Sequence, residues 1–154
     1  MTNSSQSTRS KRRGRPKSES LYTFYQIQIT GWEFGWSFNL VRPQDEWKKR
    51  GYFDEFSTLT LKGRVCVPEH FRYPEAILDL VSDYELRQPT SRPHGIGSMS
   101  ASNGQLRGFI CIPSAGIASL LSIVNSLACI EIIGTPLRYR KGLISSISVG
   151  TILE

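Results

Sequence analysis

The sequence predicts an α+β protein: a mostly antiparallel sheet, built as a curved sheet or an open sandwich, that packs one amphipathic helix near the C-terminus. Three observations predict this class. Apolar and polar residues alternate with a period of two over several stretches after residue 20, one later stretch has helical spacing, and Gly or Pro separates these runs. With 154 residues the chain is long enough for one domain with a core. We expect that single domain at residues 21–154.

Residues 1–20 are expected to form a disordered basic arm. They contain eight Ser or Thr residues, and Met1 is their only apolar side chain. Such a segment cannot bury enough apolar surface to offset the conformational entropy lost on folding. Its six Lys or Arg residues and one Glu account for +5 of the chain's net charge of +6, so the rest of the chain is almost neutral.

Residues 22–40 are predicted to form a β-hairpin with a two-residue turn at Thr30 and Gly31. In "YTFYQIQITGWEFGWSFNL" the alternation of apolar residues changes phase at this point. A turn there would place Tyr25 opposite Trp36, with the aromatic residues in one row on one face. We expect this row to be core. The alternative is a platform that stacks unpaired bases, but such platforms interleave basic residues with aromatic ones and this stretch has none.

Residues 42–56 mix charged residues with Pro and Gly and are predicted to be a solvated loop. Beyond them, "LKGRVCVP" at 61–68 and "LRGFICIP" at 106–113 share the same order of residue types. Each is predicted to be a strand with Leu, Gly and two aliphatic residues on one face, ended by Pro. The similarity suggests two related half-units, and chance resemblance between two strands is the alternative.

A helix is predicted in "SAGIASLLSIVNSLA" at 114–128, with Ser114 as its N-cap. Its apolar residues Leu120, Leu121 and Val124 should be buried, while Ser119, Ser122 and Asn125 should face solvent. Residues 76–86 are ambiguous between helix and strand, and we favour a strand by analogy with "CIEIIG" after the helix. The chain should end in two strands, "PLRYRK" and "LISSISVG", separated by Gly142.

The cysteines and histidines show no pattern typical of a reaction or a metal site. Cys66, Cys111 and Cys129 are widely spaced among aliphatic residues, which predicts buried free thiols. His70 and His94 lie in Pro-rich segments with no Ser, Cys or carboxylate at a motif spacing. We therefore expect a non-enzymatic protein with no cofactor and no metal. No membrane partner is expected either, because no apolar run approaches the roughly 18 residues that span a bilayer.

The segment "SKRRGRPKSES" at 10–20 resembles an AT-hook, a short peptide family that binds the minor groove of A·T-rich DNA. The residues that carry the resemblance, with their basic flanks, are Lys11, Arg12, Arg13, Gly14, Arg15, Pro16 and Lys17. The resemblance implies that Arg13 and Arg15 enter the groove, which is narrow in A·T tracts and strongly negative. Gly14 would allow close approach of the backbone, and Pro16 would keep Arg15 extended.

The match to the hook departs from the family pattern at position 12. Arg12 stands where the family has its first Pro, so one element of preorganisation is missing, and the motif occurs once. A nuclear import signal and a solubilising tail are the alternatives, because Lys/Arg-rich runs serve both.

The remaining basic residues form a possible second surface. Lys62, Arg64, Arg107, Arg138 and Arg140 occupy predicted strand positions that face away from the aliphatic residues. They could form a basic face beside the arm, but a plain solvated face is favoured because the body is almost neutral. The globular part also resembles small uncharacterised bacterial proteins with a "GTPLRYRKGLISSIS"-like hairpin, which implies no function.

These observations predict a non-enzymatic DNA-associated protein. Its basic arm would contact the minor groove of A·T-rich DNA, and its β-rich body would mediate partner binding or oligomerisation. Its expected location is the cytoplasm, at the nucleoid in a bacterium, or the nucleus in a eukaryote. The alternative is a protein-interaction or structural module with an incidental basic tail, and the two differ in whether the arm changes the affinity for DNA.

Overall fold

A computed structural model describes residues 21–40, 53–82 and 93–150. The strands are β1 (Thr23–Leu40), β2 (Phe53–Val67), β3 (Glu75–Ser82), β4 (Gly97–Ser102), β5 (Gln105–Ile112), β6 (Cys129–Gly134) and β7 (Lys141–Gly150). Helix α1 (Ser114–Ile123) continues into a 3₁₀ turn, η2 (Val124–Ser126). The predicted basic arm, residues 42–52 of the predicted loop and residues 83–86 of the ambiguous segment lie outside the described residues.

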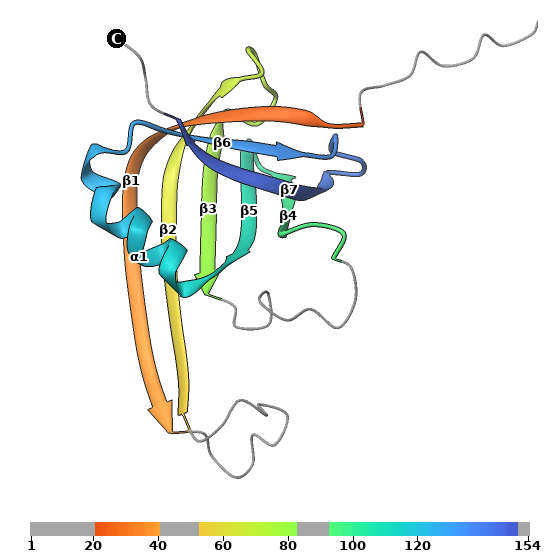
Figure 1. The fold of residues 1–154 in the computed structure, drawn as a ribbon. Coiled ribbons are helices and arrows are strands. Elements are labelled where there is room, and N and C mark those ends of the chain that lie inside the picture. Colours follow the sequence, from red (N-terminus) through yellow and green to blue (C-terminus); the bar gives the residue numbers. More distant parts are fainter. Residues whose placement is uncertain (1–20, 41–52, 83–92, 151–154) are drawn as a thin grey trace, which may run out of the picture.

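The seven strands form a closed barrel in the order β1-β2-β3-β5-β4-β7-β6 (Figure 1). Neighbouring strands are antiparallel except for β3 and β5, which run parallel. The predicted class is confirmed: the described chain is mostly antiparallel β with one helix near the C-terminus. The sheet closes on itself instead of staying open, which pairs the strand edges within the barrel.

Strand β1 is continuous, so the predicted turn at Thr30 and Gly31 is wrong. Ile29 lies opposite Gly63 and Gly31 lies opposite Lys62, which leaves Thr30 as one extra residue on β1. This is a β-bulge. A bulge shifts the alternation of side chains by one residue, and a two-residue turn produces the same change of phase in the sequence. Tyr25 is therefore far along the strand from Trp36 and does not face it.

Both similar segments are strands, as predicted, and they pair with opposite edges of β3. Leu61 of β2 lies opposite Leu78 in an antiparallel pair, and Gly108 of β5 lies opposite the same Leu78 in a parallel pair. A Cβ atom on Gly108 would come within 2.8 Å of a Leu78 methyl carbon, so this glycine makes room for a core side chain. The predicted strand in the ambiguous segment is confirmed over Glu75–Ser82, which is β3.

The predicted helix is confirmed over residues 114–126, and α1 packs against β2 and β3 (Figure 1). Ile117 and Val124 join the barrel core, and Leu120 and Leu121 pack against it half-buried. The predicted polar face is exposed, comprising Ser119, Ser122 and Asn125. Ser114 does not cap the helix, because Pro113 is the N-cap and makes no side-chain hydrogen bond.

Two sequence boundaries differ from the structure. "PLRYRK" is not a strand: residues 135–140 connect β6 to β7, and Gly142 lies inside β7 instead of separating two strands. Phe53 begins β2, so residues 53–56 of the predicted loop are strand. The predicted strand "CIEIIG" is confirmed as β6.

The three cysteines differ in burial. Cys129 is buried and Cys111 is half-buried, but Cys66 is exposed, so the prediction of a buried thiol is wrong at Cys66. Cys66 follows the inward-facing Val65 on β2 and therefore points outward. Burial raises the pKa of the Cys129 thiol, with further contributions from the charges of Glu131 and Cys66, so this thiol stays protonated at neutral pH.

Candidate functional site

Two surfaces stand out, one at each end of β1 (Figure 1). A cationic turn between β6 and β7 lies where β1 begins, beside the residue at which the basic arm joins the barrel. An exposed aromatic face lies where β1 ends. The predicted DNA-contacting residues, Lys11 to Lys17, lie outside the described part of the chain, which begins at Leu21.

The basic arm joins the barrel beside two cationic side chains. Leu21 lines a hollow of about 730 Å³ together with Arg138 and Lys141. Hydroxyl-bearing residues of β4 and of the β6–β7 connection, such as Ser98 and Thr135, complete its polar wall. Arg138 and Lys141 therefore place positive charge beside Leu21, the residue at which the described part of the chain begins.

Residues Arg138 to Lys141 form a tight turn, which we call the cationic turn. The Arg138 N–H donates to the Lys141 carbonyl at 2.8 Å, and the Lys141 N–H donates to the Arg138 carbonyl at 3.0 Å. Tyr139 and Arg140 between them have φ values of 50° and 64°. Positive φ at both central residues is typical of a type I′ turn, which strongly prefers Asn and Gly. Two side chains with a Cβ here cost roughly 1 to 2 kcal/mol each.

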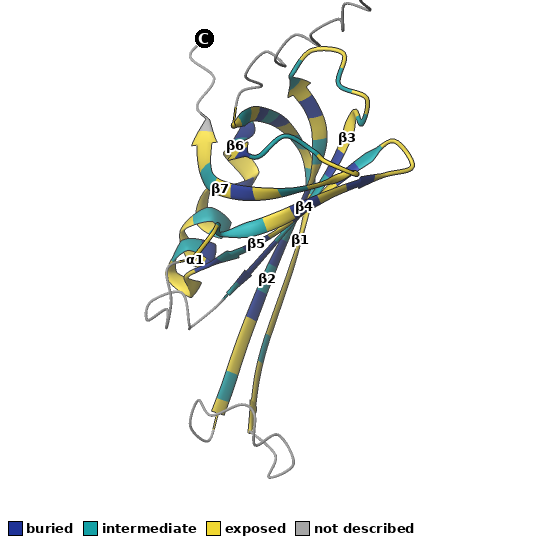
Figure 2. Cartoon of the chain, turned by 90° about the vertical axis from the view of Figure 1, so that its right-hand side faces the viewer, coloured by how far each residue is buried: buried dark blue, intermediate teal, exposed yellow. Residues whose placement is uncertain are grey.

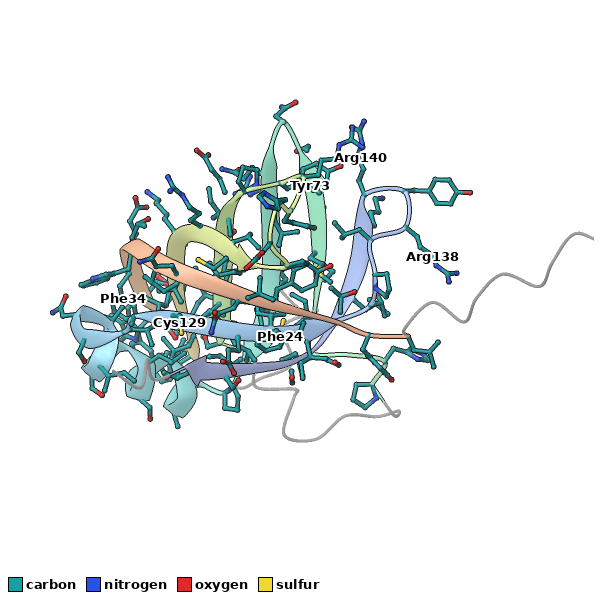
Figure 3. All side chains as sticks on the ribbon, turned by 90° about the horizontal axis from the view of Figure 1, so that it is seen from above. Phe24, Phe34, Tyr73, Cys129, Arg138 and Arg140 are labelled. Carbon is teal, nitrogen blue, oxygen red and sulfur yellow. The ribbon has the colours of Figure 1, made fainter. Side chains whose placement is uncertain are left out.

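The cationic turn is exposed and carries no compensating charge. Tyr139 is 99% exposed, and no Asp or Glu occurs between Thr135 and Leu143. Within the described ranges, none of its basic side chains forms an ion pair. Figure 3 shows Arg138 and Arg140 projecting outward from the β6–β7 connection.

A second hollow, of about 430 Å³, lies between the cationic turn and the β2–β3 connection. Arg140 lines it together with Arg72 and Tyr73, and the Arg72 guanidinium lies 5.7 Å from the centre of the Tyr73 ring. This cation–π contact holds a third guanidinium group near the turn.

The other predicted basic residues do not form one face with the turn. Lys62, Arg64 and Arg107 lie on the outer surface of β2 and β5, whereas Arg138 and Arg140 belong to the turn. Lys62 forms an ion pair with Glu33, and Arg107 lies 3.7 Å from the Asp79 carboxylate. The carboxylates of β1 and β3 thus offset the outer face, as expected for a solvated sheet surface.

Strands β1 and β2 extend beyond the barrel as a two-stranded ribbon, residues 36–40 and 53–57 (Figures 1 and 2). The pairing of β2 with β3 stops at Thr58, and the pairing of β1 with β6 stops at Gln28. The side chains that continue the inward face of the barrel along this ribbon and its base form what we call the aromatic face. Its apolar members are Trp32, Phe34, Trp36, Phe38, Leu40 and Phe53, and the polar residues Glu55 and Ser57 of β2 lie on the same side of the ribbon.

The predicted burial of the aromatic row is confirmed for Tyr25 and wrong for Trp32, Phe34, Trp36 and Phe38, because β1 extends beyond the part of the barrel that would cover these side chains. Every apolar member of the aromatic face is 40 to 68% exposed. The Trp36 and Phe38 rings stack 6.3 Å apart at 7°, and Phe38 and Phe53 stack 5.3 Å apart at 18°. The Trp36 indole N–H donates to the Glu55 carboxylate at 3.0 Å. The planes of the three rings are therefore nearly parallel, and the rings follow one another along the ribbon.

The base of the ribbon is tied to the helix layer. The Trp32 indole N–H donates to the Asn125 side-chain oxygen at 3.3 Å. The opposite face of the ribbon is more polar, with Ser37, Asn39 and Asp54, although it also carries Phe56. Sequence reasoning missed this surface because alternation shows which residues share a face, and it does not show where the covering layer ends.

Comparison of the chain with protein-family models, curated proteins and solved structures gives no match. Function is therefore inferred from the fold and its surfaces. None of the helices in the described part is long and apolar enough to cross a membrane. Among residues 21–40, 53–82 and 93–150, His, Cys, Asp and Glu side chains do not gather in groups of three or more that could hold a metal ion.

Proposed function

We propose that this is a non-enzymatic DNA-associated protein. Arg13 and Arg15 of the hook-like segment enter the minor groove of A·T-rich DNA, and the cationic turn contacts phosphates of the same duplex. The body binds a partner through a different surface. One observation carries this proposal: Leu21, where the basic arm joins the barrel, shares a hollow with Arg138 and Lys141.

The distances along the chain are compatible with a joint interface. Only three residues lie between Lys17 and Leu21, and an extended chain spans at most about 3.6 Å per residue. The hook-like segment and the cationic turn can therefore reach neighbouring phosphates of one duplex, which carries a negative charge about every 1.7 Å along its axis.

The strain of the cationic turn also supports a role for its side chains. Tyr139 is almost fully exposed, and Arg140 is exposed and makes no ion pair with a described residue, so neither side chain gains burial or an ion pair that would offset its positive φ. Strained positions of this kind are concentrated at functional sites. The exposed Tyr and Arg are a suitable pair for contacts to sugar and phosphate.

Titrations on A·T-rich and G·C-rich duplexes of equal length, at several salt concentrations, test the proposal. Replacing Arg13 and Arg15 with Ala should remove the preference for the A·T duplex. Replacing Arg138 and Arg140 with Ala should weaken binding to both duplexes equally and make the log–log salt slope shallower by about 1 to 2. A matched control, Arg64→Ala with Arg107→Ala, removes the same charge from the outer sheet face and should leave binding unchanged.

Three results would count against this function. Equal affinities that fall equally when Arg13 and Arg15 are replaced would leave only nonspecific charge and end the minor-groove interpretation. If the control pair weakens binding as much as the Arg138 and Arg140 pair, the cationic turn is not part of the interface. No binding to either duplex would favour the second candidate, an interaction module with an incidental tail, which the exposed aromatic face supports.

A further inference from the structure

We infer that the aromatic face is a self-association surface, on which a second copy of the chain packs its own aromatic face about a twofold axis. This inference names the partner of the body, so it rests on the partner-binding part of the proposed function and not on DNA binding. The exposed apolar area of the face, the pairing of the ribbon strands and the charge of the ribbon support this self-association.

The exposed apolar area suits a dimer. Five of the six apolar members of the aromatic face are aromatic and 40 to 59% exposed, and Leu40 is 68% exposed. With about 150 to 250 Å² for each aromatic side chain, the face offers roughly 500 to 700 Å². That is at or above the largest apolar patch of a typical monomer, about 300 to 600 Å². Two such faces would bury roughly 1,000 to 1,400 Å², which reaches the lower range of specific interfaces.

The described ribbon is a single layer of two strands whose apolar side has no second layer packed on it. In the described part of the chain, residues 36–40 and 53–57 pair only with each other. A two-stranded hairpin alone in water is at best marginally stable, and it needs further strands or a second layer against its apolar face. A second ribbon packed face to face provides that layer.

The charge of the described ribbon favours an uncharged apolar partner over a polyanion. Its charged residues are Asp54 and Glu55, with Glu33 at its base, and residues 32–40 and 53–57 contain no Lys or Arg. On the side of the ribbon that carries the rings, the charged side chain is Glu55, which lies opposite Phe38, whereas Asp54 and Glu33 lie on the other side. A nucleic acid phosphate or an anionic lipid headgroup that approached the rings would meet the Glu55 carboxylate with no Lys or Arg of the described ribbon beside it. In a twofold pair, each Glu55 carboxylate keeps its hydrogen bond to the Trp36 indole of its own chain while the rings of the two copies pack together. A surface that is complementary to itself is what a twofold interface requires.

Sedimentation of the full chain over a range of concentrations tests the inference. The wild-type chain should sediment as a dimer, and Phe38→Lys should weaken the association by about 30-fold or more, as expected for a central aromatic residue. The matched control is Phe109→Lys, because Phe109 has a similar exposure, 50% against 54%, and lies on β5 away from the ribbon. This control should remain dimeric.

A second variant and a check of folding distinguish loss of the dimer interface from unfolding of the chain. Leu40→Lys, at the far end of β1, changes the most exposed apolar member of the aromatic face and should also weaken the dimer. Circular dichroism and thermal melting should show both variants folded. A dimer that dissociates only when a ribbon variant unfolds would overturn the inference.

Several outcomes would overturn the inference independently of DNA binding. The first is a wild-type chain that is monomeric at all concentrations. The second is an equal loss of the dimer in Phe38→Lys and in Phe109→Lys. The third is a monomer that binds phosphatidylcholine vesicles and loses this binding in Phe38→Lys. A monomer that still prefers A·T-rich DNA would overturn self-association alone. A dimer that binds neither duplex would overturn the DNA proposal alone.

Discussion

At Gly63 of β2 the backbone of β1 leaves no room for a side chain, and replacing this residue with Ala should destabilise the barrel. A Cβ atom at Gly63 would lie 2.2 Å from the Gln28 carbonyl oxygen and 2.8 Å from a methyl carbon of Ile27. The first of these contacts is with backbone, so it can be relieved only by moving β1 away from β2. Gly63 also lies opposite Ile29, beside the bulge, where the register of the two strands is set.

The expected cost of Gly63→Ala is at the upper end of the range for overpacked cores, about 3 kcal/mol. For a chain of this size, each kcal/mol lowers the melting temperature by roughly 2 to 4 °C, so the midpoint should fall by roughly 6 to 12 °C. Thermal melting followed by circular dichroism measures it.

Gly35→Ala is the matched control for Gly63→Ala. Gly35 lies on β1 at the base of the ribbon, and a Cβ atom there would meet no atom within 4 Å. This substitution should leave the stability unchanged or raise it by about 0.4 to 1 kcal/mol, because Ala restricts the unfolded chain. Equal midpoints for the two variants would refute the close approach of β1 and β2 at Gly63, and with it the bulged register.

Two further predictions concern stability. Burial raises the pKa of Tyr25 above its ordinary value, and the hydrogen bond with Thr23 lowers it by a smaller amount. The phenol therefore ionises at lower pH in the unfolded chain than in the folded one. The stability that depends on neutral Tyr25 is complete below about pH 10 and decreases as the pH rises above it. Melting curves from about pH 9 to about pH 11 should show this loss, and Tyr25→Phe should reduce it. Ile117→Ala should lower the free energy of unfolding by about 2 to 5 kcal/mol, because Ile117 is buried in the core. Ser122→Ala on the exposed face of α1 should change it by less than about 0.5 kcal/mol. Equal effects of the two substitutions in urea unfolding would contradict the packing of the Ile117 face of α1 against the barrel.

Part of the candidate site could be predicted from the sequence, and part could not. The concentration of positive charge in the basic arm is a property of composition, so it needs no structure. The sequence predicts that Arg138 and Arg140 lie on a strand, because they alternate with Leu137 and Tyr139 as residues of a strand do. The type I′ turn at this point lacks the Asn and Gly that normally reveal it, so local sequence could not show that these residues project from the end of the barrel.

The sequence by itself determined most of the strands, the helix and which side chains of one periodic run share a face. Those properties follow from local periodicity, because a strand repeats every two residues and a helix every 3.6. Most of β1, β3, β5, β6 and β7, residues 61–67 of β2 and helix α1 are therefore recognisable without coordinates.

Only the tertiary structure decided what covers each face. A bulge at Thr30 and a turn at Thr30 and Gly31 change the alternation in the same way, so the sequence could not distinguish one long strand from two paired ones. That choice depends on whether β1 pairs with β2 and β6 or with itself, which is a matter of long-range contacts. The same contacts bury Tyr25 inside the barrel and leave Trp36 exposed beyond it, although both belong to one run of alternating apolar residues.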